Sequence, residues 1–568
     1  MRRWGYALWV LAIAVFAVLH AWRLCADFPN GSPWIFDWAK YTDEGWYGNA
    51  AIRAHLFGNW YLAGDFTPAP AVPVWPFAEW VLFFFTGVTV EAARGLAVAC
   101  FFANLALSYL LLRSRGPHEP DTVSGVGSGV GSRGPRSHPT NEDLSTTPAN
   151  KTAYWGPRVS AGAPVWMALL AVTLVVTSPF LYCFSRLAIL EPLLTVLTLT
   201  VLNLAVRLPR FRRPVLTSVL IGLLFALMAL TKTTAVFLAP ALGWAIVLPL
   251  GTRRRLGLQC ALAAAVAAAF AYGLWMVLIA GFGLLDDYKY FFVIANAYPM
   301  PTAFYWPLVA FWWSFHGLLW IDHSVVPLAG AMVLAAAIAW RREWGRSLWR
   351  EPLFGASVLA IVGYLLFMTV QNHPQPRYFA VPAFFCFFVV ALGAAALLRQ
   401  SGLARGLGWA TMAIAVAAAG VHGAQTIRYA THPEYTFVNA ATRLTQYIDA
   451  HPNGKRLMVS ISGDEITLIT HLPTLCDELS TQQLPAKLAA YQPGWYATWN
   501  DLDPEILQDL HAHFSLEQTV SFTAFDDPGR NQLVLFKLRP LPDGQVRNPG
   551  DQNFKVALPG DKIDIPVE

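Results

Sequence analysis

The sequence predicts a mainly α-helical, polytopic membrane protein that ends in a small soluble α/β domain. Of its 568 residues, 55% are hydrophobic and 13% are charged, whereas soluble globular chains carry about 25% charged residues. Residues 1–428 hold 30 Lys and Arg against 17 Asp and Glu, a formal charge of +13, while residues 429–568 carry −8. This composition excludes a soluble enzyme. It also excludes a disulfide-stabilised scaffold, because six cysteines are too few for a chain of this length. The change of sign predicts two domains, 1–428 in the membrane and 429–568 outside it.

Apolar runs define the expected helices, because a helix needs about 20 mostly apolar residues to cross a bilayer. Two stretches, 74–90 and 305–321, are interrupted by polar residues and are expected to be interfacial or re-entrant helices. If both crossed the membrane, the number of spans would rise from eleven to thirteen. The eleven runs of sufficient length are 5–25, 94–113, 163–183, 192–207, 214–231, 234–250, 257–282, 324–340, 353–370, 379–398 and 406–427.

The positions of Lys and Arg predict the orientation. With the N-terminus inside, 21 cations fall in the inner connections and eight in the outer ones, as the positive-inside tendency requires. The first run is long, flanked by Trp and lacks a small-residue cleavage site, so it is interpreted as a signal anchor. Residues 114–160 are rich in Gly, Ser, Pro and Thr and are expected to form a disordered cytoplasmic loop.

Asp43 and Glu44 lie in the first outer segment, just after Thr42. One interpretation is structural: Thr42 caps an interfacial helix, and the two carboxylates stabilise the positive end of its dipole. The other is catalytic, because a carboxylate held just above the bilayer can act as a general base. The two interpretations are compatible.

Four more polar residues mark the outer ends of later spans. Glu191 begins a span beside Pro192, and a carboxylate there needs a partner, which Arg186 or Lys232 could supply. Lys232 is either a snorkelling cation or a phosphate contact. Arg377 departs from the positive-inside tendency and, with Tyr378, suits phosphate recognition.

These residues together resemble the GT-C membrane glycosyltransferases, in the branch of the protein O-mannosyltransferases and the lipid A aminoarabinose transferases. The resemblance covers roughly residues 1–400. It rests on Asp43-Glu44 after the first span, R-x-x-x-x-E at 186–191, L-T-K at 230–232 and R-Y-x-x-x-P at 377–382. It implies an inverting glycosyltransferase of the hexosyl or pentosyl type, which moves a sugar from a polyprenyl phosphate to an envelope lipid, glycan or protein. It also implies a bacterial inner membrane, with the active site on the outer face.

The resemblance also implies roles for single residues. Asp43 matches the carboxylate that deprotonates the acceptor, with Glu44 as its companion. Glu191 matches a second acidic position that is often Asp in the family. Lys232 and Arg377 match cations near the donor phosphate, and Arg186 and Tyr378 are expected to bind the same phosphate. Mg²⁺ or Mn²⁺ between Asp43 and Glu191 is compatible with their hard oxygen ligands, but nothing in the sequence requires a metal.

The tail after residue 429 alternates between helix and strand patterns. Asp464 is interpreted as a helix cap, and the residues from about 540 as extended chain. The expected elements are a helix at 437–451, an apolar run at 456–462, a helix that opens at 463–465, a helix at 503–514, and strands at 518–525 and 532–538.

Two other functional classes fit less well. A transporter or flippase of a lipid-linked glycan would bury polar groups at mid-membrane, often within internal repeats, whereas here the carboxylates gather at one surface. A non-catalytic scaffold would leave the grouping of Asp43, Glu191, Lys232 and Arg377 unexplained. Nucleic acid is excluded as a partner, because the Arg residues lie in short connections between apolar runs and are not expected to form a continuous basic surface.

Overall fold

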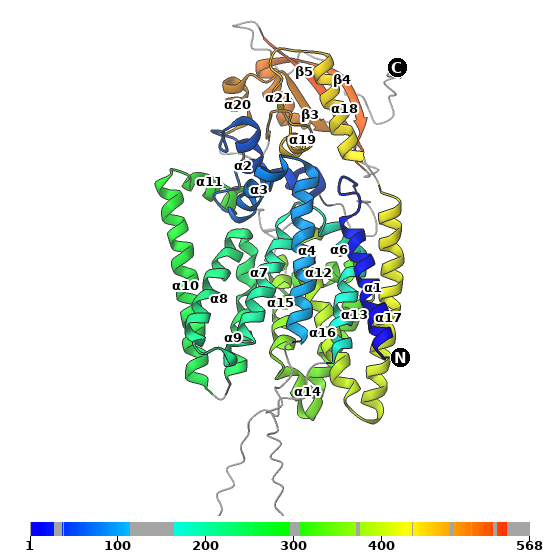
Figure 1. Ribbon diagram of the computed structural model, residues 1–568. Coiled ribbons are helices and arrows are strands. Elements are labelled where there is room, and N and C mark those ends of the chain that lie inside the picture. The colour runs from blue at the N-terminus through cyan, green and yellow to red at the C-terminus, as the bar shows by residue number, and fades with distance from the viewer. Residues whose placement is uncertain are drawn as a thin grey trace, which may run out of the picture.

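The computed structural model of the protein consists of a bundle of helices and a smaller unit with a sheet that lies on one end of it (Figure 1). This unit, residues 436–541, is called the C-terminal unit below. The predicted loop 114–160 and most of the predicted extended tail lie outside the described residues. The structure describes residues 2–27, 37, 39–113, 164–251, 253–295, 307–370, 375–433, 436–477, 482–500, 502–525 and 531–541.

The secondary-structure elements of the described chain before residue 432 are all helices, joined by turns and loops. They are α1 (Arg2–Ala21), η1 (Ala39–Asp43), α2 (Glu44–Phe57), α3 (Val74–Thr86), α4 (Val90–Arg113), α5 (Val165–Thr177), α6 (Pro179–Phe184), α7 (Leu190–Ala205), η2 (Leu208–Arg210), α8 (Pro214–Thr231), η3 (Thr233–Leu238), α9 (Ala239–Val247), η4 (Leu248–Leu250), α10 (Arg254–Gly281), α11 (Leu285–Lys289), η5 (Tyr290–Ala295), α12 (Pro307–Ile321), α13 (Val325–Ile338), η6 (Ala339–Arg341), α14 (Glu343–Trp349), α15 (Pro352–Val370), η7 (Pro376–Phe379), α16 (Ala380–Leu398) and α17 (Gly402–Thr431).

Every apolar run predicted to span the membrane contains a helix. Among the described residues, eight helical segments are long and apolar enough to cross a bilayer, or nine if the bent pair α13–η6 and α14 is one span. The predicted spans 163–183 and 192–207 contain shorter apolar helices, α5 and α7. The first of these runs is broken because Pro179 starts a new helix, α6, which Ser178 caps. The chain is therefore an integral membrane protein, while the exact count of eleven spans stays a prediction.

Helix α16 forms the centre of the bundle. Of the apolar segment 376–398, 89% is buried inside the protein, compared with 17% for α10 at the periphery. Helices α5, α13, α15 and α17 pack around α16. The short helix η7 leads directly into this central helix, so a side chain on η7 is held at the end of the most buried of the candidate spans.

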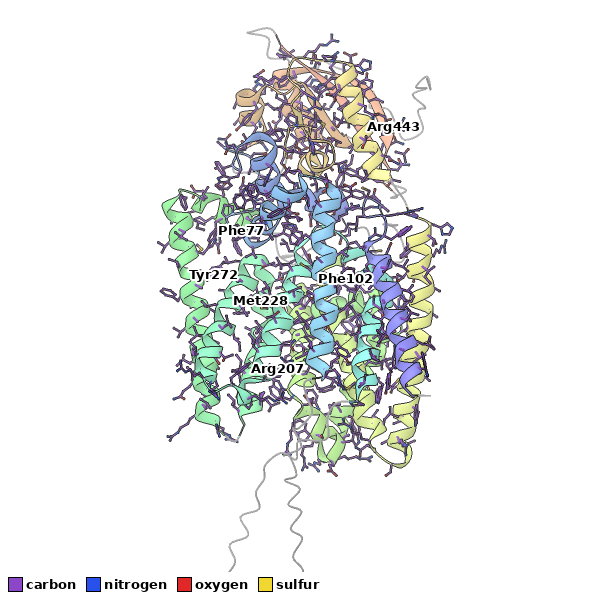
Figure 2. The ribbon with its side chains drawn as sticks, in the orientation of Figure 1. Phe77, Phe102, Arg207, Met228, Tyr272 and Arg443 are labelled. Atoms are coloured by element: carbon purple, nitrogen blue, oxygen red, sulfur yellow. The ribbon has the colours of Figure 1, made fainter. Side chains whose placement is uncertain are left out.

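Helices α2 and α3 do not join the bundle but lie between it and the C-terminal unit (Figure 1). The predicted interfacial stretch 74–90 is α3, whose side chains Phe77, Phe84 and Phe85 are exposed. Exposed aromatic rings are typical of the interface between lipid and water. Arg207 lies toward the end of the bundle that is away from the C-terminal unit, which carries Arg443 (Figure 2).

The C-terminal unit contains a five-stranded sheet with strand order β2-β1-β3-β5-β4. Strand β1 is parallel to β2 and β3, and β5 is antiparallel to β3 and β4. The patterns predicted as helices at 437–451 and 503–514 and as strands near 518–525 and 532–538 are confirmed. The elements are α18 (Thr436–Ala450), β1 (Met458–Val459), α19 (Gly463–Thr470), β2 (Thr474–Leu475), α20 (Leu484–Tyr491), β3 (Trp495–Trp499), α21 (Pro504–His513), β4 (Phe514–Thr523) and β5 (Gln532–Pro540).

Close packing of α8 on α10 generates a stability prediction. A Cβ at Gly222 of α8 would overlap the carbonyl oxygen of Ala264 of α10, whereas Gly243 of α9 has open space around its Cβ position. We expect Gly222→Ala to force the two helices apart and to lower the melting midpoint. We expect Gly243→Ala to leave it unchanged or raise it, because alanine at an unstrained glycine position stabilises by about 0.4–1 kcal/mol. Thermal unfolding of the purified protein in detergent measures both, and an equal effect of the two changes would contradict the packing.

Candidate active site

Five of the residues singled out in the sequence meet in one buried cluster at the end of the bundle that faces the C-terminal unit. They come from separate elements: Asp43 ends η1, Glu191 opens α7, Lys232 lies between α8 and η3, and Arg377 and Tyr378 lie on η7. The four charged side chains belong to residues that are at most 6% exposed. Such burial is costly for a charge that has no partner, so the pairings inside the cluster decide what it can do.

Arg377 bridges two carboxylates. Its Nη1 donates to Oδ1 of Asp37 at 2.6 Å, and its backbone N–H donates to Oδ2 of the same residue at 2.9 Å. Its Nη2 lies 2.7 Å from Oδ2 of Asp43. This second contact is close but is not aligned as a hydrogen bond. Asp43 is therefore held by charge, while lone pairs on Oδ2 stay available for a proton.

Lys232 pairs with Glu191. The ammonium group of Lys232 donates to Oε1 of Glu191, whereas Oε2 of Glu191 is buried without a hydrogen-bond partner in the described part of the chain. The ring of Tyr378 lies beside both cations, with Nζ of Lys232 4.5 Å and Cζ of Arg377 5.1 Å from its centroid. Tyr378 therefore separates the two cations and stabilises each through its ring face.

The local structure around Asp43 differs from the predicted helix cap. Residues 39–43 form η1, one turn of π-helix. Asp43 rather than Thr42 is the N-cap residue of α2. Asp43 makes no side-chain cap hydrogen bond, and the hydroxyl of Thr42 donates to Oδ1 of Asp43. The prediction that Thr42 caps the helix is thus wrong, because the π-turn carries the helical backbone through Thr42.

Glu44 and Arg186 take part in other contacts. Glu44 accepts from Nε and Nη2 of Arg94 at 2.8 and 2.6 Å and from the backbone N–H of Ala188 at 2.8 Å, so it ties α2 to α4 and to the segment before α7. Arg186 donates to the Tyr182 hydroxyl and to the carbonyl oxygens of Trp22 and Arg23. These bonds hold the end of α1 against α6. Of the two partners considered for Glu191, the structure pairs it with Lys232.

The surroundings change the acidity of two groups on the first outer segment. Burial raises the pKa of Asp43 above its usual range, although the nearby Arg377 opposes this shift. Burial, together with the charge of Asp43, raises the pKa of Tyr47 well above its ordinary value. Tyr47 lies one turn after Asp43, so it offers the site a hydroxyl that stays neutral. A base with a raised pKa is better matched to a hydroxyl proton at neutral pH.

The residues present do not fit a divalent cation between Asp43 and Glu191. Each carboxylate already faces a cationic side chain, and the part of the chain that the structure describes brings no group of three His, Cys, Asp or Glu side chains together for a metal. Mg²⁺ and Mn²⁺ need several oxygen ligands around one point. No step is therefore assigned to a metal.

Sequence reasoning missed Asp37 and Arg94. Asp37 looked like an ordinary loop residue, yet it orients Arg377 from a distance of 340 residues along the chain. Arg94 was counted only as an outer cation, yet it is buried and clamps Glu44. The one signal was charge itself: both lie next to apolar segments, where a charged residue needs a partner.

Comparisons with known proteins identify the fold. Neither a protein-family model nor a curated protein sequence matches the chain. Among solved structures it is similar to ArnT from Cupriavidus metallidurans in the apo state, with 13% identity and a TM-score of 0.56 over 94% of this chain and 98% of ArnT. With ArnT bound to undecaprenyl phosphate the TM-score is 0.52, at 12% identity over 93% of this chain and 98% of ArnT.

A looser likeness links the chain to the archaeal oligosaccharyltransferase AglB from Archaeoglobus fulgidus. Its TM-score of 0.47, at 11% identity over 95% of this chain and 75% of AglB, is too low to carry an argument. The likeness to ArnT extends over nearly the whole of both chains. The chain therefore has the GT-C fold that its sequence motifs predict.

The pairing of Lys232 with Glu191 generates a second prediction. We expect Lys232→Met to lower the melting midpoint strongly, since breaking a buried ion pair costs about 3–5 kcal/mol by leaving one charge unpaired. The double variant Lys232→Met/Glu191→Leu should recover most of the loss, because it removes both charges. Thermal unfolding in detergent measures this coupling.

The exposed pair of Lys289 and Asp286 on α11 is the matched control. Their side chains are 60% and 88% exposed and lie 3.5 Å apart, so Lys289→Met should barely change the melting midpoint. Additive losses from Lys232→Met and Glu191→Leu would contradict a buried, coupled pair.

Proposed function

We propose that the protein is a glycosyltransferase that moves a sugar from a polyprenyl phosphate to an acceptor hydroxyl on the extracytoplasmic side of the membrane. The observation that carries this proposal is the single buried cluster that joins a candidate base, Asp43, to two cations, Arg377 and Lys232. A displacement at a sugar carbon needs both: a base for the attacking hydroxyl and positive charge for the departing phosphate.

The setting of the cluster supports a lipid-linked donor. Lys232 and Glu191 lie where membrane helices end and begin, so a phosphate bound there would have its lipid chain beside the bundle. ArnT, which has the same fold, has been crystallised with undecaprenyl phosphate. The acceptor is proposed to be an envelope lipid, glycan or protein, with the C-terminal unit above the site.

The reaction is one displacement with inversion. Asp43 takes the proton from the acceptor hydroxyl while the oxygen of that hydroxyl attacks the anomeric carbon of the sugar. The bond from that carbon to the phosphate oxygen breaks, and the electron pair leaves with the polyprenyl phosphate. Lys232 and Arg377 stabilise the negative charge that develops there, while Glu191 and Asp37 keep these two cations in place. Glu44 and Arg186 have no role at the reacting atoms in this scheme, since their contacts join structural elements.

Replacement of Asp43 by Asn tests the proposal. Purified protein in lipid is given a panel of polyprenyl-phosphate sugars, with a membrane extract as the source of acceptor, and the release of polyprenyl phosphate is measured. We expect the wild type to release polyprenyl phosphate from one donor. In Asp43→Asn the rate of this release should fall about 10²–10⁴-fold, because an amide cannot take the proton.

Asp286→Asn is the matched control, since it makes the same chemical change on an exposed helix close to the outer surface. It should keep the wild-type rate. If no donor releases polyprenyl phosphate, or if Asp43→Asn is as active as Asp286→Asn, the proposal fails and a transport assay becomes the next experiment.

The raised pKa of Asp43 gives a prediction for the pH profile. Asp43 can act as a base only when ionised, so kcat/KM should fall as the pH drops through the raised pKa. The acidic limb should therefore lie clearly above pH 4, where an ordinary aspartate of pKa about 3.9 titrates. Initial rates from pH 4 to 8 measure the limb, and a limb at or below about pH 4 would exclude Asp43 in this environment as the essential base.

A further inference from the structure

The helix that carries Asp43 does not cap its own first turn. The first N–H groups of any helix lack partners inside the helix, and the usual solution is a side chain of the N-cap residue that accepts from the second or third helical residue. Asp43 holds the N-cap position of α2 and is an aspartate, one of the best caps, yet it makes no such bond. Its carboxylate turns instead to Arg377.

The acceptor for this first turn comes from the C-terminal unit. Oε2 of Glu465, on α19, accepts from the backbone N–H of Gly45 at 2.7 Å. Gly45 is the second residue of α2, a position whose N–H an N-cap side chain commonly binds. Asp43 has helical φ and ψ angles of −70° and −31° here, so its carboxylate could reach this N–H only if its backbone turned to the extended conformation of a capping residue. Glu465 is fully buried and lies 420 residues further along the chain. A distant carboxylate thus takes the place of the local cap.

The contact between α2 and α19 leaves no room for a side chain at position 45. A Cβ on Gly45 would overlap the backbone of Asp464 and Glu465. Backbone atoms cannot move aside as the end of a long side chain can. Glycine therefore allows the first turn of α2 to rest directly on the first turn of α19, which brings the carboxylate of Glu465 to the N–H of Gly45.

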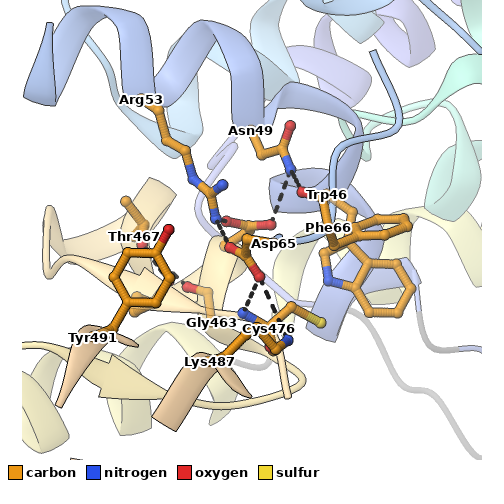
Figure 3. A network of polar contacts seen from close by, with 12 residues as sticks. Trp46, Asn49, Arg53, Asp65, Phe66, Gly463, Thr467, Cys476, Lys487 and Tyr491 are labelled. Carbon is orange, nitrogen blue, oxygen red and sulfur yellow. Dashed lines mark hydrogen bonds and ion pairs between the residues drawn. The ribbon is translucent and has the colours of Figure 1, made fainter. Parts of the chain in front are cut away.

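Two further residues on the same face of α2 fix this arrangement. Asn49 and Arg53 follow Gly45 at intervals of four residues, and both donate to the carboxylate of Asp464, at 3.2 and 2.8 Å. Arg53 also donates to Asp65 at 2.6 Å (Figure 3). Asp464, which the sequence suggested as a helix cap, is instead the partner of α2. Burial raises the pKa of Asp464 to about 6, and Arg53 opposes that shift.

We infer that Glu465 is a positioning residue that keeps the carboxylate of Asp43 available for the acceptor hydroxyl. By satisfying the N–H of Gly45, it removes the donor for which Asp43 would otherwise leave Arg377. The inference rests on the proposed function, because it gives Glu465 a role in the same reaction. It adds that the C-terminal unit completes the active site without touching the reacting atoms.

The test compares Glu465→Ala with Glu465→Gln. The alanine variant leaves the Gly45 N–H free for Asp43, so we expect kcat to fall about 10- to 100-fold while KM for the donor changes little. Departure from Arg377 removes the charge that opposes the raised pKa of Asp43, and one neutral N–H donor replaces it only in part, so the acidic limb of kcat/KM should move to higher pH. Glutamine keeps an oxygen acceptor and should restore most of kcat and the position of the limb.

The shift of the limb separates positioning from folding. A variant that merely unfolds loses active enzyme without moving its pH profile. Glu517→Ala, in an exposed pair with Arg539 on the same unit, is the control and should match the wild type. The inference is overturned if Glu465→Ala has the kcat and the acidic limb of the wild type. It is also overturned if kcat falls equally in Glu465→Ala and Glu465→Gln.

A structure of Glu465→Ala gives a readout that does not depend on activity. We expect Asp43 to bind the N–H of Gly45 and to leave Arg377. If Asp43 stays on Arg377, the inference fails even where the transferase assay succeeds. If the wild type releases no polyprenyl phosphate but Asp43 moves in the variant, the geometric part holds and the proposed function fails.

Discussion

The guanidinium of Arg377 is the contact on which the cluster depends. It stands at the end of the most buried helix of the bundle and pairs with two carboxylates of the first outer segment. Without it, Asp37 and Asp43 would be two buried like charges that have lost their shared cation, an arrangement that costs several kcal/mol. The same contact fixes where η1 lies, and η1 leads directly into α2. One cation therefore links the rigid centre of the membrane part to the segment that reaches the C-terminal unit.

The balance of charge in the cluster explains how it can serve an anionic ligand. Three carboxylates, those of Asp37, Asp43 and Glu191, face the two cations of Arg377 and Lys232. A phosphate that approaches the cations adds negative charge to a cluster in which negative charge is already in excess. A proton on Asp43 relieves this excess, and the raised pKa of Asp43 favours such a proton. In the proposed reaction, arrival of a hydroxyl proton at Asp43 and growth of charge on the phosphate would thus be coupled electrostatically.

The sequence predicted those parts of the fold and site that depend on local composition. Length and apolarity placed the helices, and Asp43, Glu191, Lys232 and Arg377 were grouped because they share one end of the spans. It could not predict pairings across hundreds of residues, such as Asp37 with Arg377 or Gly45 with Glu465. The capping pattern misled for the same reason. A Thr-Asp-Glu sequence before a helix is a good local cap, but here a π-turn carries the helix through Thr42, and Arg377 and Arg94 pair with the carboxylates of Asp43 and Glu44. Strands β1 and β2, of two residues each, are too short to give a pattern.

The bond between Gly45 and Glu465 also sets the order in which the protein can mature. Residues 37–57 leave the ribosome long before Asp464 and Glu465 are made, so α2 waits through the synthesis of every later helix of the bundle before it meets α19. Under the proposed function, the site would be complete only after Glu465 has been made. A chain interrupted after α17 would embed its helices in the bilayer yet lack the carboxylate that completes the first turn of α2. Under the proposed function, activity would then depend on synthesis of the C-terminal unit.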